Sequence, residues 1–285
     1  MKPVPVILAT LAIAAMSFAQ QDKGQQDKSK TPAATQAAAP AQAQPAGKHP
    51  PQLKTDAEAA DYKTATAPTD AAGLEKAADD FSAKYPDSEV RVLLYKGGMR
   101  SYQSANNLEK MADLGRKVLA IDADDPEALV DVAQVLAERT RDTDLDRDQK
   151  LDEGLKYARK AIDTVDTDLS VPAGTPQDRI DAYKGLLRSS AYSIIGTIFF
   201  TKSDFANAET NLQKSIDAFP SQPDSVTVLR LAIARDKQTK YTEALVAAEK
   251  AVSLTQEGTN VGTLARRERD RLKQLTNGDV ATPKK

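Results

Sequence analysis

The chain has 285 residues, of which 39 are basic and 41 acidic, so its formal net charge is −2. It contains no cysteine, no tryptophan and a single histidine, His49. Disulfides, thiolate metal sites and thiol nucleophiles are therefore excluded, and a Ser-His-Asp triad or a multi-histidine metal site would need a second chain. The near-neutral charge gives no indication of nucleic acid as the main partner.

The N-terminus predicts an export signal. Lys2 precedes an apolar run over residues 4–15, and the small residues Ser17 and Ala19 mark a cleavage point after Ala19. The run is shorter than the roughly 20 apolar residues that a membrane-spanning helix needs. We expect residues 1–19 to be a cleaved signal peptide and the mature protein to be periplasmic or secreted; an uncleaved signal anchor is the alternative.

Residues 20–54 consist mainly of Gln, Ala, Pro, Lys and Asp. Almost none of them can fill a hydrophobic core, so the composition predicts a disordered Ala/Gln/Pro-rich tether. His49 lies in this segment between Lys48 and Pro50, where we expect a solvated side chain with no catalytic role.

From Thr55 to Thr276 the apolar residues recur at helical spacing, and no segment alternates as a strand would. The pattern predicts pairs of helices joined by short polar turns. The expected pairs are 55–66 with 75–88, two helices within 92–125, 126–139 with 151–165, 179–200 with a helix ending before Pro220, and two helices within 225–256. A final helix at about 260–275 would cap the stack, and residues 277–285 would form a disordered tail.

The clearest pair covers residues 189–222. Tyr192, Gly196 and Phe199 mark its first helix, a turn follows at residues 202–204, and Ala208 belongs to its second helix. Small residues at positions 196 and 208 would let the two backbones approach closely, and Pro220 would stop the second helix.

This unit resembles the tetratricopeptide repeat (TPR), a helix–turn–helix unit of about 34 residues. Most of the family's signature positions are filled, but Tyr192 replaces the usual Trp, and Leu212 and Ser215 replace an aromatic residue and Ala. The resemblance covers residues 55–258. It implies an all-α, right-handed helix–turn–helix solenoid of about five TPR-like repeats with a C-terminal capping helix.

The resemblance also implies protein or peptide recognition on the concave surface that the first helices of the repeats line. The outward positions expected to bind a partner are Lys96, Arg100, Gln103, Gln134, Glu138, Thr197, Phe200, Thr201, Asp236 and Lys237. Lys96 and Arg100 only faintly resemble the carboxylate clamp of chaperone-binding members, because the asparagines of that pattern are missing from the next repeat.

An acidic insertion near residues 141–150 separates the two helices of the third pair. Asp142, Asp144, Asp146, Asp148 and Glu153 have the spacing of a calcium-binding loop. However, Arg147 occupies the sharp-turn position that normally needs glycine. The alternative is a connecting loop in which Asp146 caps the next helix with Gln149 in a capping box, and this interpretation assigns no metal.

A second insertion, near residues 166–178, contains two prolines and a glycine and precedes the long helix at 179–200. We expect the insertion to lie against the extra length of this helix; the alternative is an exposed apolar ledge for a partner. The apolar run at 191–200 is too short to span a membrane and is assigned to the repeat core.

These features predict an exported scaffold that binds a protein or peptide partner and acts in assembly or tethering in the cell envelope. A calcium-responsive binding module using residues 142–153 is the alternative. No motif combines a nucleophile with a base or forms a phosphate loop, so we assign neither enzymatic activity nor a cofactor. We expect no nucleic acid partner and no transmembrane span in the mature chain.

Overall fold

A computed structural model describes residues 48–172 and 174–276. The predicted signal peptide, most of the predicted tether and the predicted tail lie outside these residues. Within the described part the chain forms helices and no strand, which confirms the all-α prediction. The helices are α1 (Asp56–Ala65), α2 (Ala71–Lys84), α3 (Arg91–Ser104), α4 (Leu108–Ile121), α5 (Pro126–Arg139), α6 (Arg147–Thr164), α7 (Gln177–Thr201), α8 (Phe205–Ala218), α9 (Ser225–Lys237), α10 (Tyr241–Ser253) and α11 (Asn260–Thr276).

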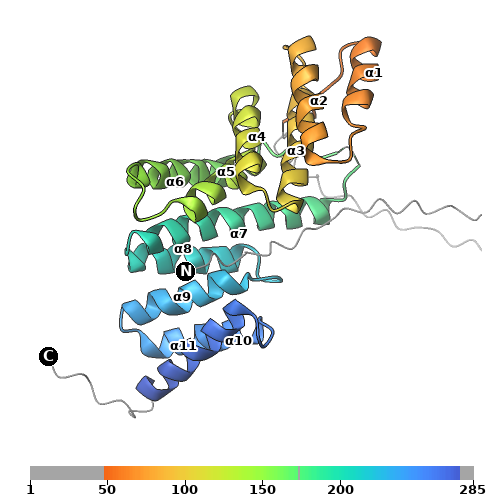
Figure 1. The fold of residues 1–285 in the computed structure, drawn as a ribbon. Helices are drawn as coiled ribbons and strands as arrows, with labels where there is room; N and C mark the ends of the chain where they lie inside the picture. The colour runs from red at the N-terminus through yellow and green to blue at the C-terminus, as the bar shows by residue number, and fades with distance from the viewer. Residues whose placement is uncertain (1–47, 173, 277–285) are drawn as a thin grey trace, which may run out of the picture.

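Successive helices pack as hairpins: α1 with α2, α3 with α4, α5 with α6, α7 with α8, and α9 with α10 (Figure 1). Each hairpin also packs on the next one, and α11 covers α10 and touches α9. The predicted solenoid of five helical hairpins with a capping helix is therefore confirmed. None of the described helices is long and apolar enough to cross a membrane.

Side-chain caps fix where seven of the helices begin. In each case the residue before the helix accepts a hydrogen bond from the backbone amide three positions later, which satisfies one of the free amides of the first turn. The capping residues are Thr55, Asp70, Asn107, Asp125, Asp204, Asp224 and Thr259. Asp125 is followed by Pro126, a residue suited to the first helical position.

The turns inside three hairpins share one backbone conformation. Asn106, Ser203 and Thr239 have positive φ angles of 55°, 60° and 62°, and each lies just after the end of a first helix. This left-handed conformation reverses the chain within three residues but is unfavourable for a branched side chain. The third hairpin differs, because the loop of residues 140–146 connects α5 to α6 in place of such a tight turn.

The predicted close approach of α7 and α8 is confirmed. Ala208 is fully buried. A Cβ atom added at Gly196 would lie 2.7 Å from Cγ and 3.0 Å from the backbone nitrogen of Leu212. No side chain larger than hydrogen fits at position 196 unless the two helices separate.

Helix α7 has 25 residues and begins slightly before the predicted residue 179. The preceding loop rests on its N-terminal half: Leu169 is buried in the same cluster as Leu187, and Asp166 forms ion pairs with Lys184 and Arg188. The expectation that this insertion lies against the long helix is confirmed.

The last residues of the predicted tether lie along the loops between hairpins. The backbone amide of Lys48 donates to Thr167 O at 2.8 Å, and its ammonium pairs with Asp122. Further along, the Lys54 ammonium donates to Asp87 O at 2.7 Å. His49 is exposed, as expected.

Candidate partner-binding site

The first helices of the hairpins line the inner face of the solenoid. Helix α5 packs against α7, and α7 contacts α9, whereas the described part of the chain has no comparable packing between α4 and α6 or between α6 and α8. From α5 to α9 the first helices therefore lie closer together than the second helices, which places them on the inner side of the stack. We call the surface formed by α3, α5, α7 and α9 the inner face.

All ten residues predicted to bind a partner lie on these four helices: Lys96, Arg100 and Gln103 on α3; Gln134 and Glu138 on α5; Thr197, Phe200 and Thr201 on α7; Asp236 and Lys237 on α9. The expectation that their side chains are free is wrong for Lys96, Gln134 and Thr197, which are less than a tenth exposed. Partner binding by the remaining positions stays a prediction.

Lys96 is buried because it belongs to a cluster of charges between α3 and α5. Its ammonium lies 2.8 Å from Asp125 Oδ2 and 2.9 Å from Glu127 Oε2. Arg100 holds the same Glu127 through two hydrogen bonds of 2.9 and 3.0 Å. These paired contacts compensate the loss of hydration and join the second hairpin to the third.

The pKa values of the cluster reflect this pairing. Burial alone would lower the pKa of Lys96, but the carboxylates of Glu127 and Asp125 hold it above its ordinary value. Burial alone would raise the pKa of Glu127, but Lys96 and Arg100 hold it below its ordinary value. Lys96 and Glu127 therefore stay ionised around neutral pH.

Tyr183, from the N-terminal half of α7, faces Arg100 and Glu127 and covers one side of the cluster. Burial, followed by the charge of Glu127, raises the pKa of its phenol well above the ordinary range. The extra length of α7 thus places a neutral hydroxyl beside Arg100 and Glu127.

Asp131 differs from the other charges of the cluster, because its carboxylate makes no hydrogen bond or ion pair with the described residues. It lies one turn beyond Glu127 on α5 and is partly buried. Burial, together with the nearby carboxylate of Glu127, raises the pKa of Asp131 to about 8. Lys96 and Arg100 are near enough to oppose this rise but do not cancel it.

Arg230 of α9, further along the inner face, is a second ionisable group whose burial is not offset by an ion pair with the described residues. Its guanidinium donates to Thr197 Oγ1 at 3.0 Å, and burial lowers its pKa despite the attraction of Glu138 and Asp224. Burial also raises the pKa of Glu138, whose carboxylate accepts from Gln134 Nε2 at 3.0 Å. Arg230 forms no ion pair within the described chain.

Neither Asp131 nor Arg230 was predicted from the sequence, although a signal was available for Asp131. It is the one charged residue in the otherwise apolar or amide run from Ala128 to Ala137. An ionisable side chain in such a run has to be desolvated by the helices around it. Arg230 is likewise the one charge among apolar residues of α9 from Val228 to Ala234.

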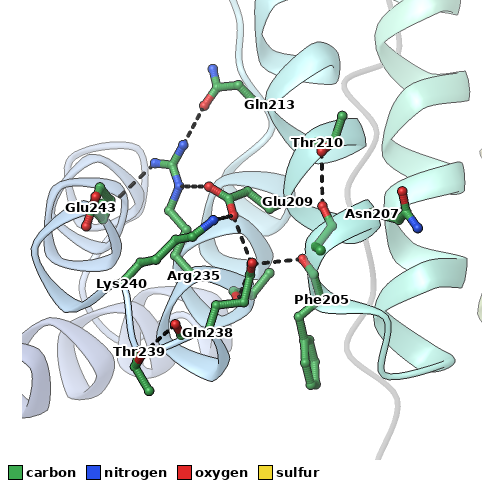
Figure 2. Close-up of polar contacts among 12 residues, drawn as sticks. Phe205, Asn207, Glu209, Thr210, Gln213, Arg235, Gln238, Thr239, Lys240 and Glu243 are labelled. Carbon is green, nitrogen blue, oxygen red and sulfur yellow. Dashed lines mark hydrogen bonds and ion pairs between the residues drawn. The ribbon is translucent and has the colours of Figure 1, made fainter.

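The polar contacts between α8 and α9 hold the last hairpins together (Figure 2). Glu209 accepts from Arg235 Nε at 3.0 Å, from Gln238 Nε2 at 2.8 Å and from Lys240 Nζ at 2.6 Å. Asp236, one of the predicted binding residues, is paired with Arg271 of α11 at 2.6 Å. The charged and polar groups of these residues already have partners within the fold, which indicates a structural role.

At the C-terminal end of α7 the predicted residues are partly available. Phe200 is partly buried and contacts Phe205 edge to face, with ring centroids 5.5 Å apart. The carbonyl of Thr201 accepts a hydrogen bond from Arg147 Nη2 at 3.0 Å. Of the predicted residues on the other helices, Gln103 of α3 is partly exposed and Lys237 of α9 is exposed.

The acidic insertion forms a loop closed by its own basic residues. Arg147 binds Asp142 at 3.1 Å and Asp148 at 2.7 Å, and Lys150 binds Asp144 at 3.3 Å and Asp146 at 2.9 Å. Helix α6 begins at Arg147 rather than at the expected residue 151, so the irregular segment ends at Asp146.

Asp146 occupies the N-cap position as predicted, but its side chain makes no capping hydrogen bond, so the predicted capping box is wrong. The ion pair with Lys150 uses the carboxylate instead. No group of three or more acidic or histidine side chains in the described part of the chain is arranged to hold a metal ion. Asp142, Asp144, Asp146, Asp148 and Glu153 do not converge, and the geometry gives no support to the calcium alternative.

No family model and no curated protein matches the chain. A solved structure of the assembly chaperone of RpL4 (Acl4, residues 1–338) is similar, with 13% sequence identity and a TM-score of 0.39, over 78% of this chain and 99% of that one. By its own architecture the chain is a helical repeat protein.

Proposed function

We propose that the chain is an exported, tetratricopeptide-like scaffold that binds a protein partner through its inner face and acts in assembly or tethering in the cell envelope. The observation that carries the proposal is the presence of Asp131 and Arg230 on that face. Both are ionisable groups that are partly removed from water and form no ion pair with the described residues. Such groups reduce stability, and sites that bind ligands are where proteins retain them.

The sequence supports the exported location through the signal pattern of residues 1–19. The Ala-, Gln- and Pro-rich residues after the predicted cleavage point have the composition of a flexible linker. No catalytic role and no nucleic acid partner are part of the proposal.

Photocrosslinking tests the binding face. A photoreactive amino acid is placed at Gln103 or Lys237 on the inner face, and at Val246 of α10 as a control, because Val246 is 62% exposed and belongs to a second helix. We expect one protein to be crosslinked from both inner positions and not from Val246. Equal capture from all three positions, or capture from Val246 alone, would refute binding through the inner face.

Mass spectrometry of the protein purified from its native cells tests the export. The proposal expects a mature N-terminus at Gln20 and recovery in the envelope or secreted fraction. An intact N-terminus in the cytoplasmic fraction would contradict it.

A further inference from the structure

Residues 48–54, which we call the strap, contact loops that lie far apart in the sequence. Near its C-terminal end, the ammonium of Lys54 donates to Asp87 O at 2.7 Å. The backbone amide of Gln52 donates to Glu89 Oε2 at 3.2 Å. Both acceptors belong to the loop between α2 and α3.

The first residue of the strap reaches two more loops. The backbone amide of Lys48 donates to Thr167 O at 2.8 Å, and the ammonium pairs with Asp122 and lies 3.9 Å from Asp168 Oδ1. Asp122 lies between α4 and α5, whereas Thr167 and Asp168 lie between α6 and α7. The strap therefore ties the first hairpin, which follows it, to the loops that begin the second, third and fourth hairpins.

Each of these loops leads directly into a helix of the inner face, since they precede α3, α5 and α7. The loop between α4 and α5 ends in Asp125, which caps α5 and pairs with Lys96 of α3 at 2.8 Å. In the loop between α6 and α7, Asp166 pairs with Lys184 of α7 at 3.5 Å. The strap thus holds the segments from which three inner-face helices start.

The sequence of the strap suits this position. The consecutive prolines Pro50 and Pro51 have fixed φ angles and favour an extended, stiff backbone. An extended chain advances about 3.3 Å per residue, so the strap spans about 20 Å from Lys48 to Lys54. Neighbouring helices pack about 10 Å apart, so this length reaches from one hairpin to the next.

Polar contacts alone hold the strap in place. Residues 52–54 are exposed, and the Lys48 side chain is 37% exposed where it pairs with Asp122. No strap residue is among the buried apolar residues of the described chain. Partly exposed ion pairs contribute little each and weaken with salt, and segments held in this way open at a lower free energy than the whole fold. The strap can therefore detach while the hairpins stay folded.

We propose that the strap fixes the spacing of α3, α5 and α7, and that its release lets the first three hairpins rotate apart and changes partner binding on the inner face. In a regular solenoid each repeat contacts its neighbours alone, and small rotations between repeats add up along the stack. A tie across several hairpins restrains these rotations. The inference goes beyond the proposed function, and only its consequence for the partner rests on that function.

The position of Lys48 also indicates how release begins. It is the strap's first residue, so a pull that arrives from the N-terminal side acts on its contacts with Thr167 and Asp122 before it acts on Lys54. Tension on the segment that precedes the solenoid would therefore free the third and fourth hairpins from the strap before the second.

Distances between spin labels test the proposal, because the chain has no cysteine and labels attach only at introduced ones. One pair replaces Ala72 of α2 and Gln149 of α6, which are exposed and lie at the helix ends remote from the strap. A control pair replaces Ala206 of α8 and Val246 of α10, which are exposed and belong to helices beyond the loops that the strap contacts.

The strap variant is Lys48→Gln plus Lys54→Gln. The control variant, Lys63→Gln plus Lys250→Gln, removes the same charge at two exposed lysines that form no ion pair with the described residues. We expect the distances between positions 72 and 149 to be narrowly distributed in wild type and in the control variant, and broader with a longer mean in the strap variant. The distances between positions 206 and 246 should be the same in all three proteins.

Salt provides a second measurement on the wild-type strap. Raising NaCl from about 0.01 M to about 1 M shortens the Debye length from about 30 Å to about 3 Å, so the distances between positions 72 and 149 should broaden as in the strap variant. This measurement decides the question if circular dichroism shows that the strap variant has lost helix. Unchanged distances between positions 72 and 149, or equal broadening in the control pair or the control variant, would overturn the inference.

The consequence for the partner is measured separately by photocrosslinking. Gln103 lies on α3, within the strapped hairpins, and Lys237 lies on α9, beyond them. The strap variant should lower the yield of crosslinks from position 103 relative to position 237, and an unchanged ratio would refute regulation of binding by the strap. The spin-label distances need no partner, so absence of all crosslinks would refute the proposed function while the distances still decide whether the strap fixes the spacing of the helices.

Discussion

The contact between α7 and α8 predicts opposite effects for the same substitution at two glycines. Gly97 and Gly196 both lie in the interior of first helices, so replacement by alanine gives each about 1 kcal/mol of helix propensity. At Gly97 the added methyl group meets no atom within 4 Å. At Gly196 it meets Leu212 Cγ at 2.7 Å and the backbone nitrogen of Leu212 at 3.0 Å, both shorter than ordinary van der Waals contact.

A side chain can rotate away, but the backbone nitrogen of Leu212 can move only with α8. Overpacking of this kind costs about 1–3 kcal/mol. Because the propensity gain is the same at both positions, the difference in stability between the two variants equals the overpacking cost. We expect Gly97→Ala to be more stable than wild type by about 1 kcal/mol and to exceed Gly196→Ala by about 1–3 kcal/mol.

Urea denaturation followed by circular dichroism measures this difference. Gly196→Leu and Ala208→Leu should lower stability further, since each adds a larger side chain to the same contact. If Gly97→Ala and Gly196→Ala unfold at the same urea concentration, the close approach of α7 and α8 at Gly196 is refuted.

Three further predictions concern the buried cluster, a turn and the acidic loop. Lys96→Met should destabilise the protein by about 3 kcal/mol, because Glu127 loses a partner inside the fold; a loss below about 1 kcal/mol in urea denaturation would contradict this. Thr239→Gly should stabilise the protein by about 1 kcal/mol, because glycine adopts the left-handed conformation without the steric cost that a branched residue has there. An unchanged melting curve would argue against that conformation. Millimolar calcium should not raise the melting temperature; a rise that is lost in Asp142→Ala plus Glu153→Gln would show that the loop binds the ion.

The helices could be predicted from the sequence because their information is local. Apolar residues at helical spacing, capping residues such as Asp204 and Asp224, and small residues such as Gly196 and Ala208 all lie within or beside the element that they specify. The solenoid followed from the repetition of this pattern, since each hairpin buries its apolar side against the next.

The binding residues could not be predicted in the same way, because exposure on the inner face depends on distant elements. Lys96 occupies an outward position of α3 and would be free in an isolated repeat. It is buried because Asp125 and Glu127 of the next hairpin bind it, and α7 begins early enough to place Tyr183 beside Arg100 and Glu127 of the same cluster. In the sequence, Tyr183 belongs to a stripe of apolar residues at helical spacing, and no neighbouring residue indicates a contact with α3.

The length of α7 also affects how the protein unfolds. In a regular solenoid each repeat contacts its neighbours alone, so the array can lose repeats from either end in independent steps. Tyr183 instead connects the fourth hairpin with Arg100 of the second and Glu127 of the third. The central hairpins should therefore open as one cooperative unit, with similar hydrogen-exchange protection across α3, α5 and α7, while the C-terminal hairpin and α11 remain free to fray by themselves.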